Sequence, residues 1–163
     1  MSLILFKETP RFYGRRKGRK LSRLDILALK EGAKYIIEFE NFTEVFSEHK
    51  QKRILEIGFG NGENLVNSAK INPSTLYIGA DPFINTNVQC IKKILKYKLT
   101  NIKIWPDDIR KAINIFPIKS ISEIKLLFPD PWPKLKHHNR RLIQIDFINS
   151  IYKILKTKGT VTV

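Results

Sequence analysis

The stretch Arg53-Ile54-Leu55-Glu56-Ile57-Gly58-Phe59-Gly60-Asn61-Gly62 joins a short apolar run to three glycines at alternate positions. It predicts a strand from Arg53 to Gly58 and a tight glycine turn. A helix over 63–71 should follow and end at Asn72-Pro73. A strand, a glycine-rich turn and a helix in this order are typical of α/β proteins that bind nucleotides.

The same alternation continues to the end of the chain. Apolar runs predict strands at 76–80, 102–105 and 123–128, and a fifth strand begins at 160. Helical spacing marks segments near 88–99, 109–116 and 145–155, the last closed by Gly159. Repeated units of this length indicate an α/β fold with a parallel sheet and helices on both faces. Because the sequence stops inside the fifth strand, we expect the fold to be truncated there.

Four carboxylates follow the predicted strands: Glu56, Asp81, Asp108 and Asp130. In open parallel sheets the ligand crevice lies outside the carboxyl ends of the strands. We therefore expect these acids to face a shared ligand that is rich in hydroxyls, amines or positive charge.

The glycine spacing distinguishes between nucleotide cofactors. A dinucleotide fingerprint needs Gly-x-Gly-x-x-Gly, but Glu63 stands where its third glycine belongs. A carboxylate at Glu56 would repel a pyrophosphate, whereas it suits the cationic methionine moiety of S-adenosylmethionine. Gly58 and Gly60 would let the backbone approach that cofactor closely.

The other two acids of the cofactor hypothesis each have a second interpretation. Asp81 stands about twenty residues past the loop, where an acid accepts hydrogen bonds from ribose hydroxyls, but it also suits a turn before Pro82. Asp107 and Asp108 follow the third strand, and Asp108 is the candidate acceptor for the adenine amino group. Either residue also makes a good N-cap for the next helix.

Composition points to a polyanionic partner. The 163 residues carry 30 Lys and Arg against 15 Asp and Glu, a net charge of +15 and a pI near 10.0. Nucleic acid is the first candidate. No apolar run is long enough to span a bilayer, and the single cysteine, Cys90, fits a reducing compartment and a core position. We expect a cytoplasmic protein.

Residues 1–21 form a basic N-terminal arm, and residues 22–163 form the nucleotide-binding domain. The arm holds Arg15 and Arg16 in a segment suited to phosphate contacts, or alternatively to a disordered solvated tail. Ser22 begins a capping box for a helix expected to cover the sheet.

The most specific string is Phe128-Pro129-Asp130-Pro131-Trp132-Pro133-Lys134, with His137, His138, Arg140 and Arg141 behind it. Together with the glycine loop and the basic arm, this string resembles the bacterial tRNA (guanine-N7-)-methyltransferases over nearly the whole chain. The resemblance implies a Rossmann-like class I methyltransferase fold and S-adenosylmethionine as methyl donor.

By this resemblance Glu56, Asp81, Asp108 and Asp130 match the family's S-adenosylmethionine-binding acids. Asp130 is also cast as the catalytic residue, and Lys134 as a substrate contact. The chain departs from the family at Asp81, where glutamate is common, and beyond the fifth strand, where the family continues.

The remaining site residues concern the RNA. Trp132 offers a stacking face for a base, or alternatively a packing cap between two prolines. Arg140, Arg141 and Lys134 lie where they can meet phosphates. His137 and His138 lack partners at metal-ligand spacing, so we expect no metal.

Three functions remain open from the sequence. The first is methyl transfer to N7 of a guanine in the tRNA variable loop, with tRNA as partner and a monomer or homodimer as the assembly. The second is a methyltransferase for exocyclic amines of DNA or RNA, whose Asp/Asn-Pro-Pro-aromatic box Asp130-Pro131-Trp132 resembles without its doubled proline. The third is a non-catalytic RNA-binding module.

Overall fold

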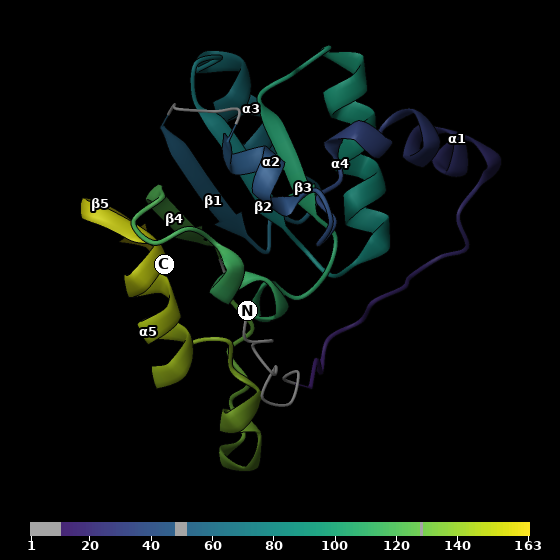
Figure 1. Ribbon diagram of the computed structural model, residues 1–163. Coiled ribbons are helices and arrows are strands. Elements are labelled where there is room, and N and C mark those ends of the chain that lie inside the picture. The colour runs from purple at the N-terminus through teal and green to yellow at the C-terminus, as the bar shows by residue number, and fades with distance from the viewer. Residues whose placement is uncertain (1–10, 48–51, 128) are drawn as a thin grey trace.

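The computed structural model describes residues 11–47, 52–127 and 129–163. Its centre is one sheet of five strands in the order β3-β2-β1-β4-β5, and every neighbouring pair is parallel (Figure 1). The strand bounds are β1 Arg53–Ile57, β2 Leu76–Ala80, β3 Ile102–Trp105, β4 Ile121–Leu126 and β5 Leu155–Thr162. The predicted Rossmann-like parallel sheet is confirmed.

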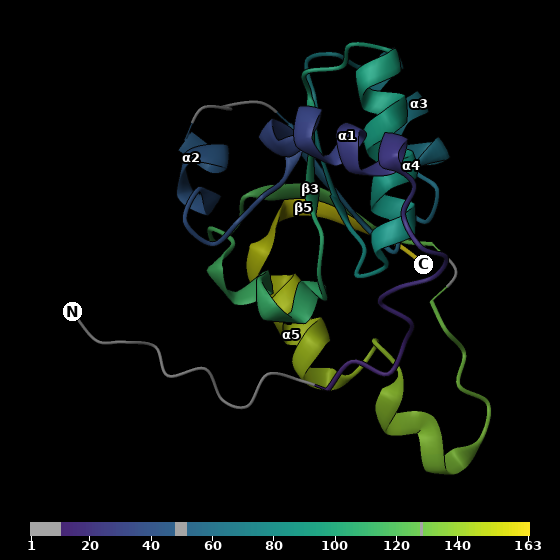
Figure 2. The ribbon, with the colours of Figure 1, turned by 90° about the vertical axis from the view of Figure 1, so that its right-hand side faces the viewer.

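Helices cover both faces of this sheet (Figures 1 and 2). The longer helices are α1 Arg23–Glu31, α2 Phe42–Ser47, α3 Glu63–Ile71, α4 Ile84–Lys96 and α5 Ile145–Ile154. Short 3-10 turns are η1 Ala33–Tyr35, η2 Ile109–Lys111, η3 Ile113–Ile115 and η4 Leu135–Arg140. Buried side chains form two cores, one on each face: α3 and α4 pack on one side, and α2, η2, η3 and α5 on the other.

The two cores follow from strand alternation. Ile54 and Tyr77 point to the face of α3 and α4, whereas Leu55 and Ile78 point to the face of α2 and α5. Each of these side chains is at least 95% buried. Burying a large apolar side chain fully stabilises the fold by roughly 1.5 to 3 kcal/mol, so a sheet that is apolar on both faces needs both helical layers.

Strand register brings the carboxyl ends of the strands to one edge. Ile57 at the end of β1 pairs with Ala80 of β2 and Leu126 of β4, and Ala80 pairs with Trp105 of β3. The chain runs outward from β1 through β2 to β3 and then returns to β4 on the other side of β1. This reversal between β1 and β4 is the position at which open α/β sheets bind ligands.

Two expected helices differ from the sequence prediction. The segment near 109–116 is not one helix but two 3-10 turns that meet at Ala112, and it ends where Phe116 is extended before Pro117. Gly159 does not close α5: the helix ends at Ile154, and Gly159 lies inside β5. Leu155 already pairs with Ile121 of β4, so strand pairing ends the helix early and the register shifts further along.

The first helix also lies elsewhere than expected. The predicted capping box at Ser22 is present, with Asp25 Oδ2 accepting the Ser22 backbone N–H at 2.8 Å. However, α1 packs on α4 rather than on the sheet, and the Lys92 Nζ of α4 lies 2.5 Å from Asp25 Oδ1. Contact with the sheet comes after the helix, where Ile36 bridges Ile104 of β3.

Candidate active site at the carboxyl edge of the sheet

A pocket of about 330 Å³ opens at the carboxyl edge of the sheet. Its walls come from the strand ends and from the arm: residues 12–15, 57–58, 80–83, 108–110, 126–127, 129–130, 132, 140 and 142. The part of the arm that the structure describes, residues 11–21, runs from α1 to the end of the molecule at which η4 projects, whereas residues 1–10 of the predicted arm lie outside the described residues (Figures 1 and 2). Segments that are far apart in the sequence therefore enclose one cavity.

The glycine loop leaves open space beside its first two glycines, of which Gly58 lines the pocket. Gly58 and Gly60 have positive φ values of 74° and 56°, a conformation that residues with a side chain rarely adopt. A Cβ built on either would meet nothing within 4 Å. Gly62, at φ 75°, is different, because its Cβ would lie 2.6 Å from Cys90 Sγ. The first two glycines thus leave room for a ligand, and the third lets α3 approach α4.

Asp81 braces this loop from the end of β2. Its Oδ2 accepts the Gly60 backbone N–H at 3.1 Å, and its Oδ1 accepts the Phe83 N–H at 2.9 Å. The side chain is buried, and burial raises the pKa of Asp81 although both backbone bonds act in the opposite direction. The Thr86 side chain also interacts with this carboxyl group, and a carboxylate has about four acceptor sites, so acceptor capacity remains for a ligand. Asp81 therefore serves as the turn residue before Pro82 and still presents acceptors to the pocket.

Glu56 is not part of the pocket wall. It shares a strand face with Ile54, so its side chain lies under α3, where Oε2 accepts the Asn64 Nδ2–H at 2.6 Å. The residue is 2% exposed, and burial raises its pKa, while the bond from Asn64 and the charge of Lys125 lower it. In this structure Glu56 supports the start of α3 behind the glycine loop.

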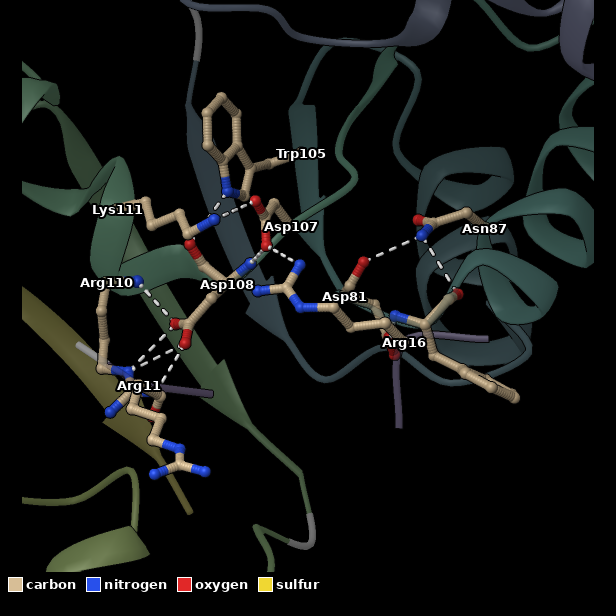
Figure 3. Close-up of polar contacts among 10 residues, drawn as sticks. Arg11, Arg16, Asp81, Asn87, Trp105, Asp107, Asp108, Arg110 and Lys111 are labelled. Carbon is tan, nitrogen blue, oxygen red and sulfur yellow. Dashed lines mark hydrogen bonds and ion pairs between the residues drawn. The ribbon is translucent and has the colours of Figure 1, made fainter. Parts of the chain in front are cut away.

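Asp108 lines the pocket, but its carboxylate is occupied. Arg110 Nη2 lies 2.6 Å from Oδ2, and Arg110 Nε lies 3.1 Å from both oxygens (Figure 3). The backbone N–H of Arg110 also donates to Oδ1 at 3.0 Å, so Asp108 is the N-cap of η2. The N-cap interpretation of Asp108 is confirmed. An adenine amino group would have to share this carboxylate with Arg110.

The neighbouring acid, Asp107, holds the arm. Its Oδ1 lies 2.5 Å from Arg16 Nη1, and its Oδ2 accepts from Lys111 Nζ at 2.6 Å (Figure 3). Burial by itself would raise the pKa of Asp107, but these cations and the Asp108 N–H hold it below its usual range. Arg16 is thus paired within the protein, and its backbone oxygen accepts the Ile84 N–H at 3.0 Å.

Asp130 is exposed on the pocket wall, and no described residue donates a hydrogen bond or an ion pair to its carboxylate. Of the four predicted acids it is the one whose carboxylate accepts no hydrogen bond from a described residue. Beside it, Trp132 lies in the left-handed region at φ 38°. Arg141 holds this turn, because its Nε donates to the Pro131 oxygen at 2.8 Å and its Nη2 to the Trp132 oxygen at 3.3 Å.

The predicted RNA-binding residues lie in different settings. Arg15 and Arg140 line the pocket, and Arg15 is exposed with no acidic partner among the described residues. Lys134 is exposed, also without such a partner, and stands before η4. Arg141 instead donates hydrogen bonds to the backbone of the turn around Trp132.

Sequence reasoning missed three contributors to the site. Tyr13 and Phe83 line the pocket, and Arg110 covers Asp108. Phe83 and Arg110 each stand two residues after a predicted acid, which is a signal that the sequence offered. Tyr13 belongs to the basic arm that carries the family resemblance, but it reaches the pocket only through the docking of that arm.

Within the described residues, no group of three or more His, Cys, Asp or Glu side chains is arranged to hold a metal ion. No helix of those residues has the length and apolar content of a membrane span.

Comparisons with known proteins agree with this architecture. The model of a family described as "Putative methyltransferase" matches residues 50–163. The tRNA (guanine-N(7)-)-methyltransferase of Rhizobium meliloti is 34% identical over 159 residues, which are 94% of this chain and 68% of that protein. An antibiotic-related methyltransferase of known structure has a TM-score of 0.54 at 22% identity, over 74% of this chain and 60% of that chain.

A second solved structure is PKMT2 from Rickettsia typhi in complex with AdoHcy. It has a TM-score of 0.53 at 20% identity, over 68% of this chain and 20% of that chain. The five-stranded parallel sheet and the family match identify an S-adenosylmethionine-dependent methyltransferase with the class I fold. By the family match and the identity to the relative, the chain belongs to the tRNA (guanine-N(7)-)-methyltransferase family.

Proposed function

We propose that this chain transfers a methyl group from S-adenosylmethionine to N7 of a guanine in the variable loop of tRNA, a tRNA modification that yields N7-methylguanosine. The observation that carries the proposal is Asp130, an exposed acid on the pocket wall with no partner among the described residues. The turn that presents it also presents an aromatic ring, that of Trp132, to the same cavity.

The proposed binding site for the cofactor is the space over the glycine loop. S-adenosylmethionine supplies an electrophilic methyl group on a sulfonium sulfur. Gly58 and Gly60 leave the room for it, and the free acceptor sites of Asp81 would take the ribose hydroxyls. Asp108 would meet the adenine amino group while it remains bonded to Arg110. Glu56 would act from behind the loop, through Asn64.

The reaction needs alignment more than acid or base groups. The in-plane lone pair of guanine N7 forms a bond to the methyl carbon, the carbon–sulfur bond breaks, and its electron pair stays on sulfur. Positive charge passes from the sulfonium to the guanine ring, and no proton moves, so no metal is needed. Asp130 would orient the base by accepting from its N1–H and amino group, and its negative charge would offset the arriving charge.

The tRNA contacts are assigned to free cations near the pocket. Arg15 and Lys134 are exposed and have no acidic partner among the described residues. Because the protein carries a net charge of +15, its affinity for tRNA should fall steeply as the salt concentration rises. We further propose that the protein acts in the cytoplasm, as a monomer or homodimer.

Product analysis tests the proposal. The purified chain is incubated with tRNA and S-adenosylmethionine, and the nucleosides after nuclease digestion are identified by mass spectrometry. N7-methylguanosine is expected from the wild type and from the control Glu31→Ala, whose exposed acid lies on α1. Asp130→Ala should lose methyl transfer while largely keeping cofactor affinity.

The other two functions predict different results. N6-methyladenosine in place of N7-methylguanosine in the digest would indicate an exocyclic-amine methyltransferase. In a separate equilibrium dialysis with labelled cofactor, binding of tRNA without any binding of S-adenosylmethionine would indicate an RNA-binding module. Full turnover by Asp130→Ala would refute the orienting role of that acid.

A further inference from the structure

The guanidinium of Arg140 lies over two aromatic rings that come from separate parts of the chain, and Arg11 also lies over one of them, that of Tyr13, at 5.4 Å. The Arg140 guanidinium carbon is 4.7 Å from the ring centre of Tyr13 and 5.1 Å from that of Trp132. Tyr13 belongs to the arm, and Trp132 belongs to the turn after β4. All three side chains line the same pocket as Asp130. The two rings therefore share a planar cation in the wall of the proposed active site.

The Trp132 ring is held in place by more than this contact. Its backbone adopts a φ of 38°, which is strained for a residue with a large side chain. Arg141 keeps the turn by donating to the carbonyl oxygens of Pro131 and Trp132. His137 meets the indole edge-on, with ring centres 5.6 Å apart at an angle of 89°. Strain that is maintained by surrounding contacts is characteristic of functional sites.

A guanidinium and a purine share the properties that such a pair of rings can bind. Both are flat and delocalised, and guanine acquires positive charge as its N7 takes the methyl group. Aromatic faces carry partial negative charge and attract a cation placed over them. A pair of rings that already holds a planar cation would thus hold the methylated base more tightly than the unmethylated one.

We infer that Tyr13 and Trp132 form a slot for the target guanine, and that Arg140 occupies this slot until the base enters. This inference rests on the proposed function and deepens it, because it names the residues that select a guanine gaining charge. Since the slot binds the cationic ring better, it favours the transition state over the ground state, which is the requirement for raising the rate. Arg140, once displaced, becomes free for a tRNA phosphate, and its return competes with the methylated product for the slot.

The inference is tested with small ligands in place of tRNA. Binding of N7-methylguanosine monophosphate and of guanosine monophosphate is measured by quenching of tryptophan fluorescence, with S-adenosylhomocysteine present. Trp132 is the partly exposed reporter, whereas Trp105 is 3% exposed and should contribute a constant background. The variants are Arg140→Ala, Tyr13→Ala and the matched control Tyr13→Phe, which keeps the ring.

The wild type should prefer the methylated nucleotide by about tenfold, the scale of one well-placed cation–π contact. Arg140→Ala should bind it several-fold more tightly, because the competitor is gone. Tyr13→Phe should keep the preference, and Tyr13→Ala should lose most of it. Equal binding of the two nucleotides by the wild type, or an unchanged preference in Tyr13→Ala, would refute the inference that Tyr13 and Trp132 bind the guanine.

Failure of the slot can be separated from failure of the proposed function. If tRNA gains N7-methylguanosine but the nucleotides bind equally, the slot is wrong and the reaction stands. If the preference is present but no N7-methylguanosine forms on tRNA, the reaction assignment is wrong and the slot stands as a site for cationic purines. Circular dichroism of each variant verifies that the sheet is intact.

Discussion

Two glycines of one loop share a backbone conformation but meet different surroundings. Gly58 has φ 74° and Gly62 has φ 75°. A Cβ at Gly58 would enter open space in the pocket, whereas a Cβ at Gly62 would lie 2.6 Å from Cys90 Sγ and 3.3 Å from its Cα. The pair Gly58→Ala and Gly62→Ala therefore separates the backbone penalty from what occupies the space beyond it.

The expected stabilities follow from these contacts. Alanine in the left-handed region costs about 1 to 2 kcal/mol, and the stiffer unfolded chain returns about 0.4 to 1 kcal/mol, so Gly58→Ala should cost about 1 kcal/mol. Gly62→Ala adds an overpacked contact worth about 1 to 3 kcal/mol, for a total near 2 to 4 kcal/mol. In a chain of this size, 1 kcal/mol shifts Tm by about 2 to 4 °C.

Cofactor affinity should show the opposite order. The methyl group of Gly58→Ala would occupy the seat proposed for S-adenosylmethionine, so Kd should rise at least about tenfold. Gly62→Ala, measured below its Tm, should bind nearly as the wild type does, because its methyl group points into the protein. Equilibrium dialysis with labelled cofactor, beside thermal unfolding, gives both quantities. Wild-type affinity in Gly58→Ala would show that the cofactor does not lie over this loop.

Two charge substitutions give further expectations. Burial raises the pKa of Asp81 above its usual 3.8, so cofactor affinity should begin to fall at a higher pH than it would for an exposed aspartate. The Asp81→Asn variant should bind the cofactor about tenfold more weakly and lose this pH dependence. Calorimetric titrations at several pH values measure both effects. Lys92 and Ser22 hold the pKa of Asp25 below 3.8, so their stabilising contribution is complete above that pH and is lost as the pH falls through the lowered pKa. Lys92→Met should lower Tm at neutral pH and make Tm fall less steeply as the pH is lowered. A dependence of Tm on acidic pH that matches the wild type would contradict this.

The positions of the acids along the sheet edge could be predicted from sequence, because parallel strands in register must end together. Asp81 and Asp130 reach the pocket for this reason. Glu56 does not, since it shares the strand face of Ile54 and is covered by α3. Attention to the period of two along β1 would have predicted that burial.

Other features depend on contacts that no local pattern encodes. The arm docks through scattered polar bonds, such as the Gly18 N–H to Asn85 Oδ1 at 2.7 Å, and these decide that Tyr13 reaches the pocket. Likewise, the sequence alone does not determine that Arg110, rather than another cationic side chain, pairs with Asp108. The early start of β5 reflects pairing with β4, which overrides the helix-ending tendency of Gly159.

The most direct test of the central claim is a crystal structure of this chain with S-adenosylhomocysteine. The account predicts the homocysteine part above Gly58 and Gly60, the ribose hydroxyls on Asp81 and the sulfur facing the side of Asp130. A ligand bound elsewhere, or one that leaves Asp81 without a contact, would contradict it.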